Sequence, residues 1–101
     1  MNQAQLMQQM KKMQMEMARA QEELASTVVT GVAAGQLVTI EMTADHHVKS
    51  VKIAKEAIDP EDAETLEDLL VVAINDAVQK AQAASEKRMG AVTGGLKIPG
   101  F

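Results

Sequence analysis

Six basic side chains lie on two candidate helices, and by residue type they could contact phosphate groups. They are Lys11, Lys12, Arg19, Lys80, Lys87 and Arg88. Lys and Arg bind the DNA backbone without reading its sequence. The chain has one aromatic residue, Phe101, so it lacks the stacking platform of most single-strand and RNA binders. Among nucleic acids, contact from basic helices suits duplex DNA, but the residues alone do not select DNA over other partners.

The other reactive side chains do not form a catalytic or metal-binding pattern. His46 and His47 are adjacent, so on an extended chain they point to opposite sides, and there is no cysteine to assist them. No Gly-rich loop with a phosphate-binding lysine connects a strand to a helix. The acids between positions 56 and 68 would lie on a solvated helix face, where little shifts a pKa. We expect no enzyme, catalytic residue, metal, cofactor or small-molecule substrate.

The charges are unevenly distributed along the chain. The net charge is −4, which argues against coating nucleic acid through bulk charge. Residues 45–68 hold eight acids against three lysines, a net −5, and residues 80–101 hold four basic residues against one acid, a net +3. This polarity has two interpretations. It can stabilise a helix through the macrodipole, or it can present basic residues to DNA.

Residues 2–25 are predicted to form an amphipathic helix with an apolar stripe at alternating spacings of four and three. The stripe consists of Leu6, Met10, Met13, Met17, Ala20 and Leu24. This is a heptad pattern over almost three heptads. Methionine side chains suit adaptable contact surfaces. The stripe can pack on the chain's own sheet or on a second copy, and the residues alone leave both open.

After this helix the pattern predicts three strands and a second helix, all in a single domain of residues 1–101. The strands span 27–33, 37–43 and 48–53, with Val38, Ile40 and Met42 on one face and Val51 and Ile53 inward. Asp59 can cap a helix over 60–89, and Gly90 can end it. The Gly-rich tail 90–101 is either disordered or docked through its apolar residues. The expected class is α+β, with a three-stranded antiparallel sheet.

Membrane insertion and secretion are not expected. No stretch approaches 18 uncharged apolar residues, and the N-terminus is too polar for a signal peptide. The expected location is the cytoplasm.

Four strings in this order carry a family resemblance. They are Gln-Glu-Glu-Leu at 21–24, Val-Thr-Gly at 29–31, Asn-Asp-Ala-Val-Gln-Lys at 75–80, and Thr-Gly-Gly-Leu-Lys-Ile-Pro-Gly-Phe at 93–101. Together they resemble the YbaB/EbfC family of bacterial nucleoid-associated proteins over nearly the whole chain. The terminal string is the most specific of them.

The resemblance implies a tweezer-like homodimer of α-β-β-β-α subunits that holds duplex DNA between its helices. It also implies low sequence specificity, altered DNA conformation, a nucleoid location, and a role in nucleoid organisation and gene regulation. The six basic residues named above become the candidate phosphate contacts. The alternative is a protein–protein interaction module in which the Met-rich helices grip a partner helix.

Overall fold

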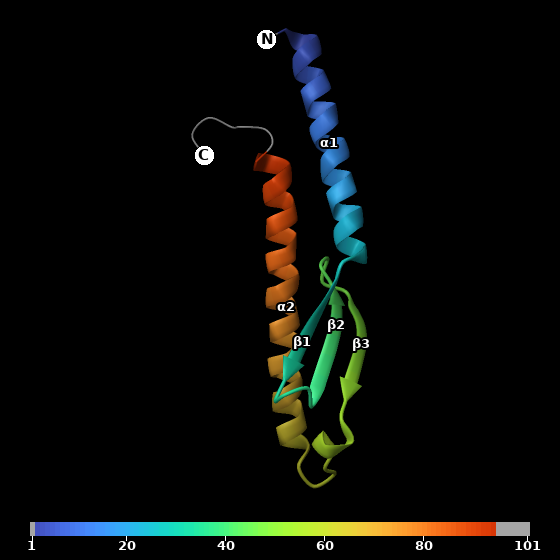
Figure 1. The fold of residues 1–101 in the computed structure, drawn as a ribbon, viewed down its shortest axis with the longest axis vertical. Coiled ribbons are helices and arrows are strands. Elements are labelled where there is room, and N and C mark those ends of the chain that lie inside the picture. Colours follow the sequence, from blue (N-terminus) through green and yellow to red (C-terminus); the bar gives the residue numbers. More distant parts are fainter. Residues whose placement is uncertain (1, 95–101) are drawn as a thin grey trace.

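The computed structural model describes residues 2–94, which form two long helices and a small sheet (Figure 1). The elements in chain order are α1 (Gln3–Ser26), β1 (Val28–Ala33), β2 (Val38–Thr43), β3 (Val48–Ile53), the short 3₁₀ helix η1 (Lys55–Ala57) and α2 (Ala63–Gly94). The α-β-β-β-α order predicted from the sequence is confirmed. The 3₁₀ helix was not predicted.

The sheet is an antiparallel meander in the order β1-β2-β3, and α2 packs on one of its faces. The core forms where Val38, Ile40 and Met42 of β2, which share one face as the alternation predicted, meet a row of small residues on α2. That row consists of Ala73, Ala77 and Ala81, all fully buried. Such small side chains let the helix backbone lie close to the strands.

Gly31 of β1 lies at a close approach of the sheet to α2. A Cβ atom at this position would lie 2.3 Å from the Ala73 carbonyl oxygen, 2.4 Å from the Ala77 nitrogen and 2.6 Å from the Ala77 Cβ. These separations are far below van der Waals contact, so only glycine fits here. Gly31 therefore sets the distance between β1 and α2.

The bounds of α2 differ from the predicted 60–89 at both ends. The helix begins at Ala63, where the Asp62 carboxylate accepts the Thr65 N–H (3.3 Å). Asp59 instead accepts the Glu61 N–H in the preceding turn. At the other end the helix continues through Gly90 to Gly94, so the first residues of the predicted tail are helical. The remaining residues, 95–101, lie outside the described part of the chain.

The third strand is less buried than predicted. Val51 lies opposite Ile40 in the register and so shares its face, yet half of its surface is exposed. The reason is that α2 covers β1 and β2, and β3 lies beyond its reach. Val51 is therefore on the predicted face but has no cover there, whereas Ile53 is half-buried.

The molecule is elongated, because both helices extend well beyond the sheet (Figure 1). Its extents are 70 × 25 × 17 Å and its radius of gyration is 19.5 Å. A compact domain of about 100 residues has a radius of gyration of about 13 Å. This shape leaves many large apolar side chains at the surface, among them Leu6, Met7 and Met10 of α1. Within residues 2–94, no helix is long and apolar enough to cross a membrane.

Candidate nucleic-acid interface

Three of the predicted DNA contacts lie on the part of α1 that projects from the sheet. Lys11, Lys12 and Arg19 are all exposed. At 100° per residue, Lys12 and Arg19 lie on the same side of the helix, about 10 Å apart along its axis, while Lys11 points about 100° away from Lys12. Since duplex DNA carries one negative charge per about 1.7 Å of its axis, this spacing allows contact with more than one phosphate.

The fold brings the last turns of α2 beside α1, with the two helices antiparallel (Figure 1). Ala20 and Leu24 of α1 are buried, as is Val92 near the end of α2. Lys87 is exposed at this end of the molecule. The structure therefore brings Arg88 beside Glu23 of α1, one turn from Arg19, although more than sixty positions separate them in the sequence, whereas Lys11 and Lys12 lie farther along α1.

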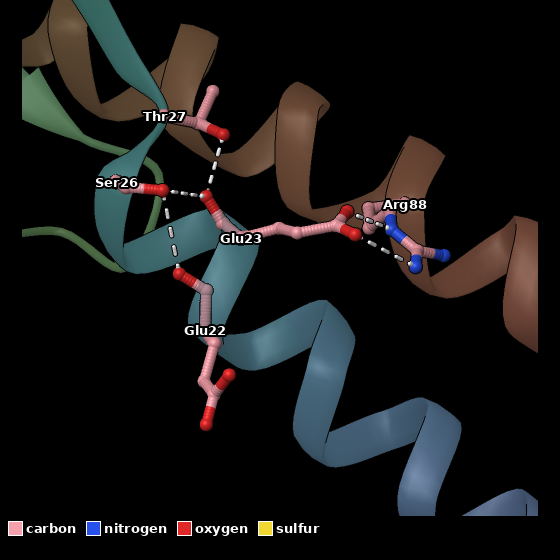
Figure 2. Close-up of polar contacts among 5 residues, drawn as sticks. All are labelled: Glu22, Glu23, Ser26, Thr27 and Arg88. Carbon is pink, nitrogen blue, oxygen red and sulfur yellow. Dashed lines mark hydrogen bonds and ion pairs between the residues drawn. The ribbon is translucent and has the colours of Figure 1, made fainter.

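Arg88 is bound by an acidic residue of α1, as Figure 2 shows. Its Nε donates to Glu23 Oε2 at 2.6 Å, and its second nitrogen lies 3.5 Å from Oε1. The hydrogen bond from Arg88, followed by its charge and that of Arg19, lowers the pKa of Glu23, and Glu23 in turn raises the pKa of Arg88. Arg88 therefore already holds an anionic partner within the chain.

Lys80 lies apart from this group and holds the outer edge of β1. Its ammonium group donates to the Thr30 carbonyl (2.9 Å) and to Asp76 (3.0 Å). The same Asp76 carboxylate accepts the Val32 N–H at 3.0 Å. That N–H, followed by Lys80, lowers the pKa of Asp76. Two side chains of α2 thus satisfy backbone groups of an edge strand that would otherwise be open to pairing.

Sequence reasoning missed both acidic partners. The acid–base spacing of Asp76 and Lys80, four residues apart on a helix, was a signal that could have indicated their pairing. No local signal links Glu23 to Arg88, because they are 65 positions apart.

The histidine pair lies in the turn between β2 and β3, where it supports the turn. His47 Nδ1 is 3.1 Å from Asp45 Oδ1, and the Thr43 hydroxyl donates to the same carboxylate. These two hydrogen bonds, with that from Thr43 the larger effect, lower the pKa of Asp45. His46 adopts a positive φ of 69° beside them. In the part of the chain described, no three His, Cys, Asp or Glu side chains are grouped so as to hold a metal ion.

The sequence was compared with models of known protein families. The model of the YbaB/EbfC DNA-binding family matches residues 1–96. The chain belongs to this family. The match includes both helices and all three strands.

Individual relatives agree with the family assignment. The chain is 52% identical over 101 residues to a protein named nucleoid-associated protein from Roseiflexus sp. (strain RS-1), with all of both chains covered. It is 53% identical over 97 residues to a protein of the same name from Chloroflexus aurantiacus (strain ATCC 29366 / DSM 635 / J-10-fl), covering 96% of this chain and 97% of the relative. Among solved structures, an uncharacterized protein from Helicobacter pylori shares the fold, with a TM-score of 0.76, 23% identity, and coverage of 95% and 98% of the two chains.

Proposed function

We propose that this protein binds duplex DNA as a homodimer, with low sequence specificity, and alters DNA conformation in the bacterial nucleoid. Such binding would give the protein a role in nucleoid organisation and gene regulation. The proposed location is the cytoplasm. The observation that carries the proposal is the set of exposed basic side chains at the end of the molecule where α1 projects from the sheet beside the last turns of α2. Membership of the DNA-binding family and the names of the relatives support it.

The proposed contacts are those of the six predicted basic residues that form no hydrogen bond or ion pair within residues 2–94. They are Lys11, Lys12, Arg19 and Lys87. Contacts of this kind position a protein on the duplex but carry no sequence information, which accounts for low specificity. Three acids (Glu16, Glu22 and Glu23) balance the three basic residues of α1, and Lys87 and Arg88 face one acid, Glu86, so this end carries a net charge of +1. The local balance of charge at this end is therefore more favourable for DNA than the net charge of the chain indicates.

The salt dependence of binding to a random-sequence duplex tests this mechanism. Each phosphate contact contributes about −0.9 to the slope of log affinity against log salt concentration. Replacing Lys11 and Lys12 by alanine should reduce the magnitude of that slope by about 2, or by about 4 if both subunits of a dimer contribute. The matched control is alanine at Lys52 and Lys55, which are exposed far from α1. Equal slopes for the wild type and the α1 variant would refute the proposal.

The proposed dimer uses the apolar surface that α2 leaves uncovered beside β3. We define this β3 face by Val48 and Val51 of β3, Ile58, and Val71 and Ile74 of α2, which are 40–56% exposed. A second copy is a suitable partner because the face carries opposite charges at its borders. Lys49 follows Val48 on β3, and Glu67 lies on the same side of α2 as Val71 and Ile74. Under two-fold symmetry, each lysine can approach the partner's acid.

Two adjacent valines of α2 provide a matched test of this interface. Val71 and Val72 are both 56% exposed, but Val72 lies one turn before Asp76, on the β1 side of the helix. Val71→Asp should convert the dimer into a monomer, because it places a charge within the apolar interface. Val72→Asp should leave the dimer intact. Analytical ultracentrifugation distinguishes the two, and equal behaviour of both variants contradicts the β3 face as the interface.

The alternative function, a protein-interaction module, is favoured by the exposed apolar residues toward the start of α1. Leu6, Met7, Met10 and Met15 are 50–65% exposed. If the variant lacking Lys11 and Lys12 keeps full DNA affinity, this surface becomes the better candidate for the functional site.

A further inference from the structure

The joint between α1 and the sheet is short and strongly hydrogen-bonded. Thr27 is the single residue between the end of α1 and the start of β1. The Ala44 N–H donates to the Leu24 carbonyl (3.1 Å) and the Thr27 carbonyl (2.8 Å). The hydroxyls of Ser26 and Thr27 donate to the Glu23 carbonyl at 3.1 and 2.7 Å. The two Ala44 bonds hold the last turn of α1 on the sheet, and the hydroxyl bonds within that turn are drawn in Figure 2.

Beyond this turn α1 projects from the sheet, with Met13, Glu16 and Met17 half-buried and the other residues from Asn2 to Arg19 exposed. Ala20 and Leu24 are the residues of α1 that are buried among those described. From Leu24 to Gln3 the helix rises by about 32 Å. A change of about 10° in its direction at the joint therefore moves its tip by roughly 5 Å. The position of Lys11 and Lys12 relative to the last turns of α2 depends on what fixes this angle.

The Glu23–Arg88 ion pair lies at the point where it can fix the angle. The main chain of Glu23 is held by the joint, and its carboxylate reaches across to α2. The planar guanidinium group of arginine binds a carboxylate with a defined geometry, which a lysine ammonium group cannot reproduce. Two nitrogens of Arg88 face the Glu23 carboxylate, and the exposed fractions of the two side chains are 30% and 50% respectively.

We propose that Glu23 and Arg88 are positioning residues that set the direction of α1 for DNA, and that Arg88 is not itself a phosphate contact. The expected effect of the ion pair on DNA affinity rests on the proposed DNA-binding function, whereas its expected effect on the direction of α1 does not. It reassigns Arg88, which the sequence placed among the candidate phosphate contacts. The negative charge of Glu23 is then useful to DNA binding, although it lies among basic residues.

The direction in which Glu23→Gln changes DNA affinity distinguishes the two possible roles of Arg88, which are contact with phosphate and positioning of α1. If Arg88 contacted phosphate, Glu23→Gln would release it and remove a negative charge, so affinity would rise. If the pair positions α1, Glu23→Gln should lower affinity by about 3-fold to 10-fold relative to Glu22→Gln, the matched control at an adjacent exposed acid. Arg88→Gln should lower affinity similarly without changing the salt slope. A slope reduced by about 0.9 per subunit would overturn the proposal.

A distance measurement tests the structural part without DNA. The chain has no cysteine, so Gln9→Cys and Gln79→Cys allow spin labels to be placed on α1 and α2 alone. The measurement is made with labelled chains diluted in excess unlabelled protein, so that distances within one subunit dominate. Glu23→Gln and Arg88→Gln should each broaden the distance distribution, and the double variant should broaden it no further. The exchanged variant, Glu23→Arg with Arg88→Glu, should restore a narrow distribution.

The outcomes distinguish failure of this proposal from failure of the DNA-binding proposal. Unchanged distance distributions in both single variants would overturn the positioning role, whatever the DNA affinity. If the wild type binds no DNA but the variants broaden the distribution, the structural role stands and the proposed function fails.

Discussion

Replacing Gly31 by alanine tests the close approach of β1 to α2. The added Cβ would lie within 2.6 Å of three atoms of Ala73 and Ala77, two of them backbone atoms that cannot rotate away. Overpacking of a well-packed site costs about 1–3 kcal/mol, and contact with backbone places this variant near the upper value. Alanine in place of glycine recovers roughly 0.5–1 kcal/mol of backbone entropy. The expected net loss is about 2 kcal/mol in the free energy of unfolding.

The assay is urea unfolding followed by circular dichroism, at equal protein concentrations because association adds to apparent stability. If unfolding is instead followed by heating, a loss of about 2 kcal/mol should lower the melting temperature by roughly 8–16 °C. Gly90 provides the control, since a Cβ there meets no atom within 4 Å and the residue lies inside α2. Gly90→Ala should therefore stabilise the protein by up to about 1 kcal/mol.

The sign of the change in the free energy of unfolding shows whether β1 lies as close to α2 as the structure indicates. Without the close approach, alanine in a strand would be neutral or stabilising, because it removes only backbone freedom. A Gly31→Ala variant as stable as the wild type, or more stable, would show that β1 and α2 are farther apart than described.

Further predictions concern the attachment of α1 and the clamp on β1. Leu24→Ala should destabilise the protein by about 2–3 kcal/mol because Leu24 is buried. Leu6→Ala, at an exposed site, should change stability by less than about 0.5 kcal/mol. Equal effects of the two variants in thermal unfolding would contradict the α1–α2 contact. Asp76→Asn should weaken the protein at pH 7. Because the pKa of Asp76 is lowered in the folded state, its contribution is present above its unfolded pKa and is lost as pH falls through the folded one. The stability difference between wild type and Asp76→Asn should therefore shrink in strong acid, and a constant difference across pH would exclude this role.

The apolar periodicity of the sequence was sufficient to predict the order of the elements and the inner face of β2. Val38, Ile40 and Met42 alternate in a strand, and that period alone places them on one side, where the structure buries them. The family strings were equally local, since they depend on residue order and not on contacts. The residues at which the elements begin and end were harder to predict. Gly90 is a common helix terminator, but its cost of about 1 kcal/mol relative to alanine is small, and the helix continues to the buried Val92.

The sequence by itself determined which side chains can contact phosphate, because charge is a property of each residue. Only the tertiary structure decided which of them are already bound. Arg88 holds Glu23 and Lys80 holds Thr30, across 65 and 50 positions respectively. Likewise, the exposure of Val51 follows from where α2 ends on the sheet, and the need for Gly31 follows from the closeness of α2. Periodicity reports which face of an element is apolar, whereas the partner of that face depends on packing between elements that are distant in the chain.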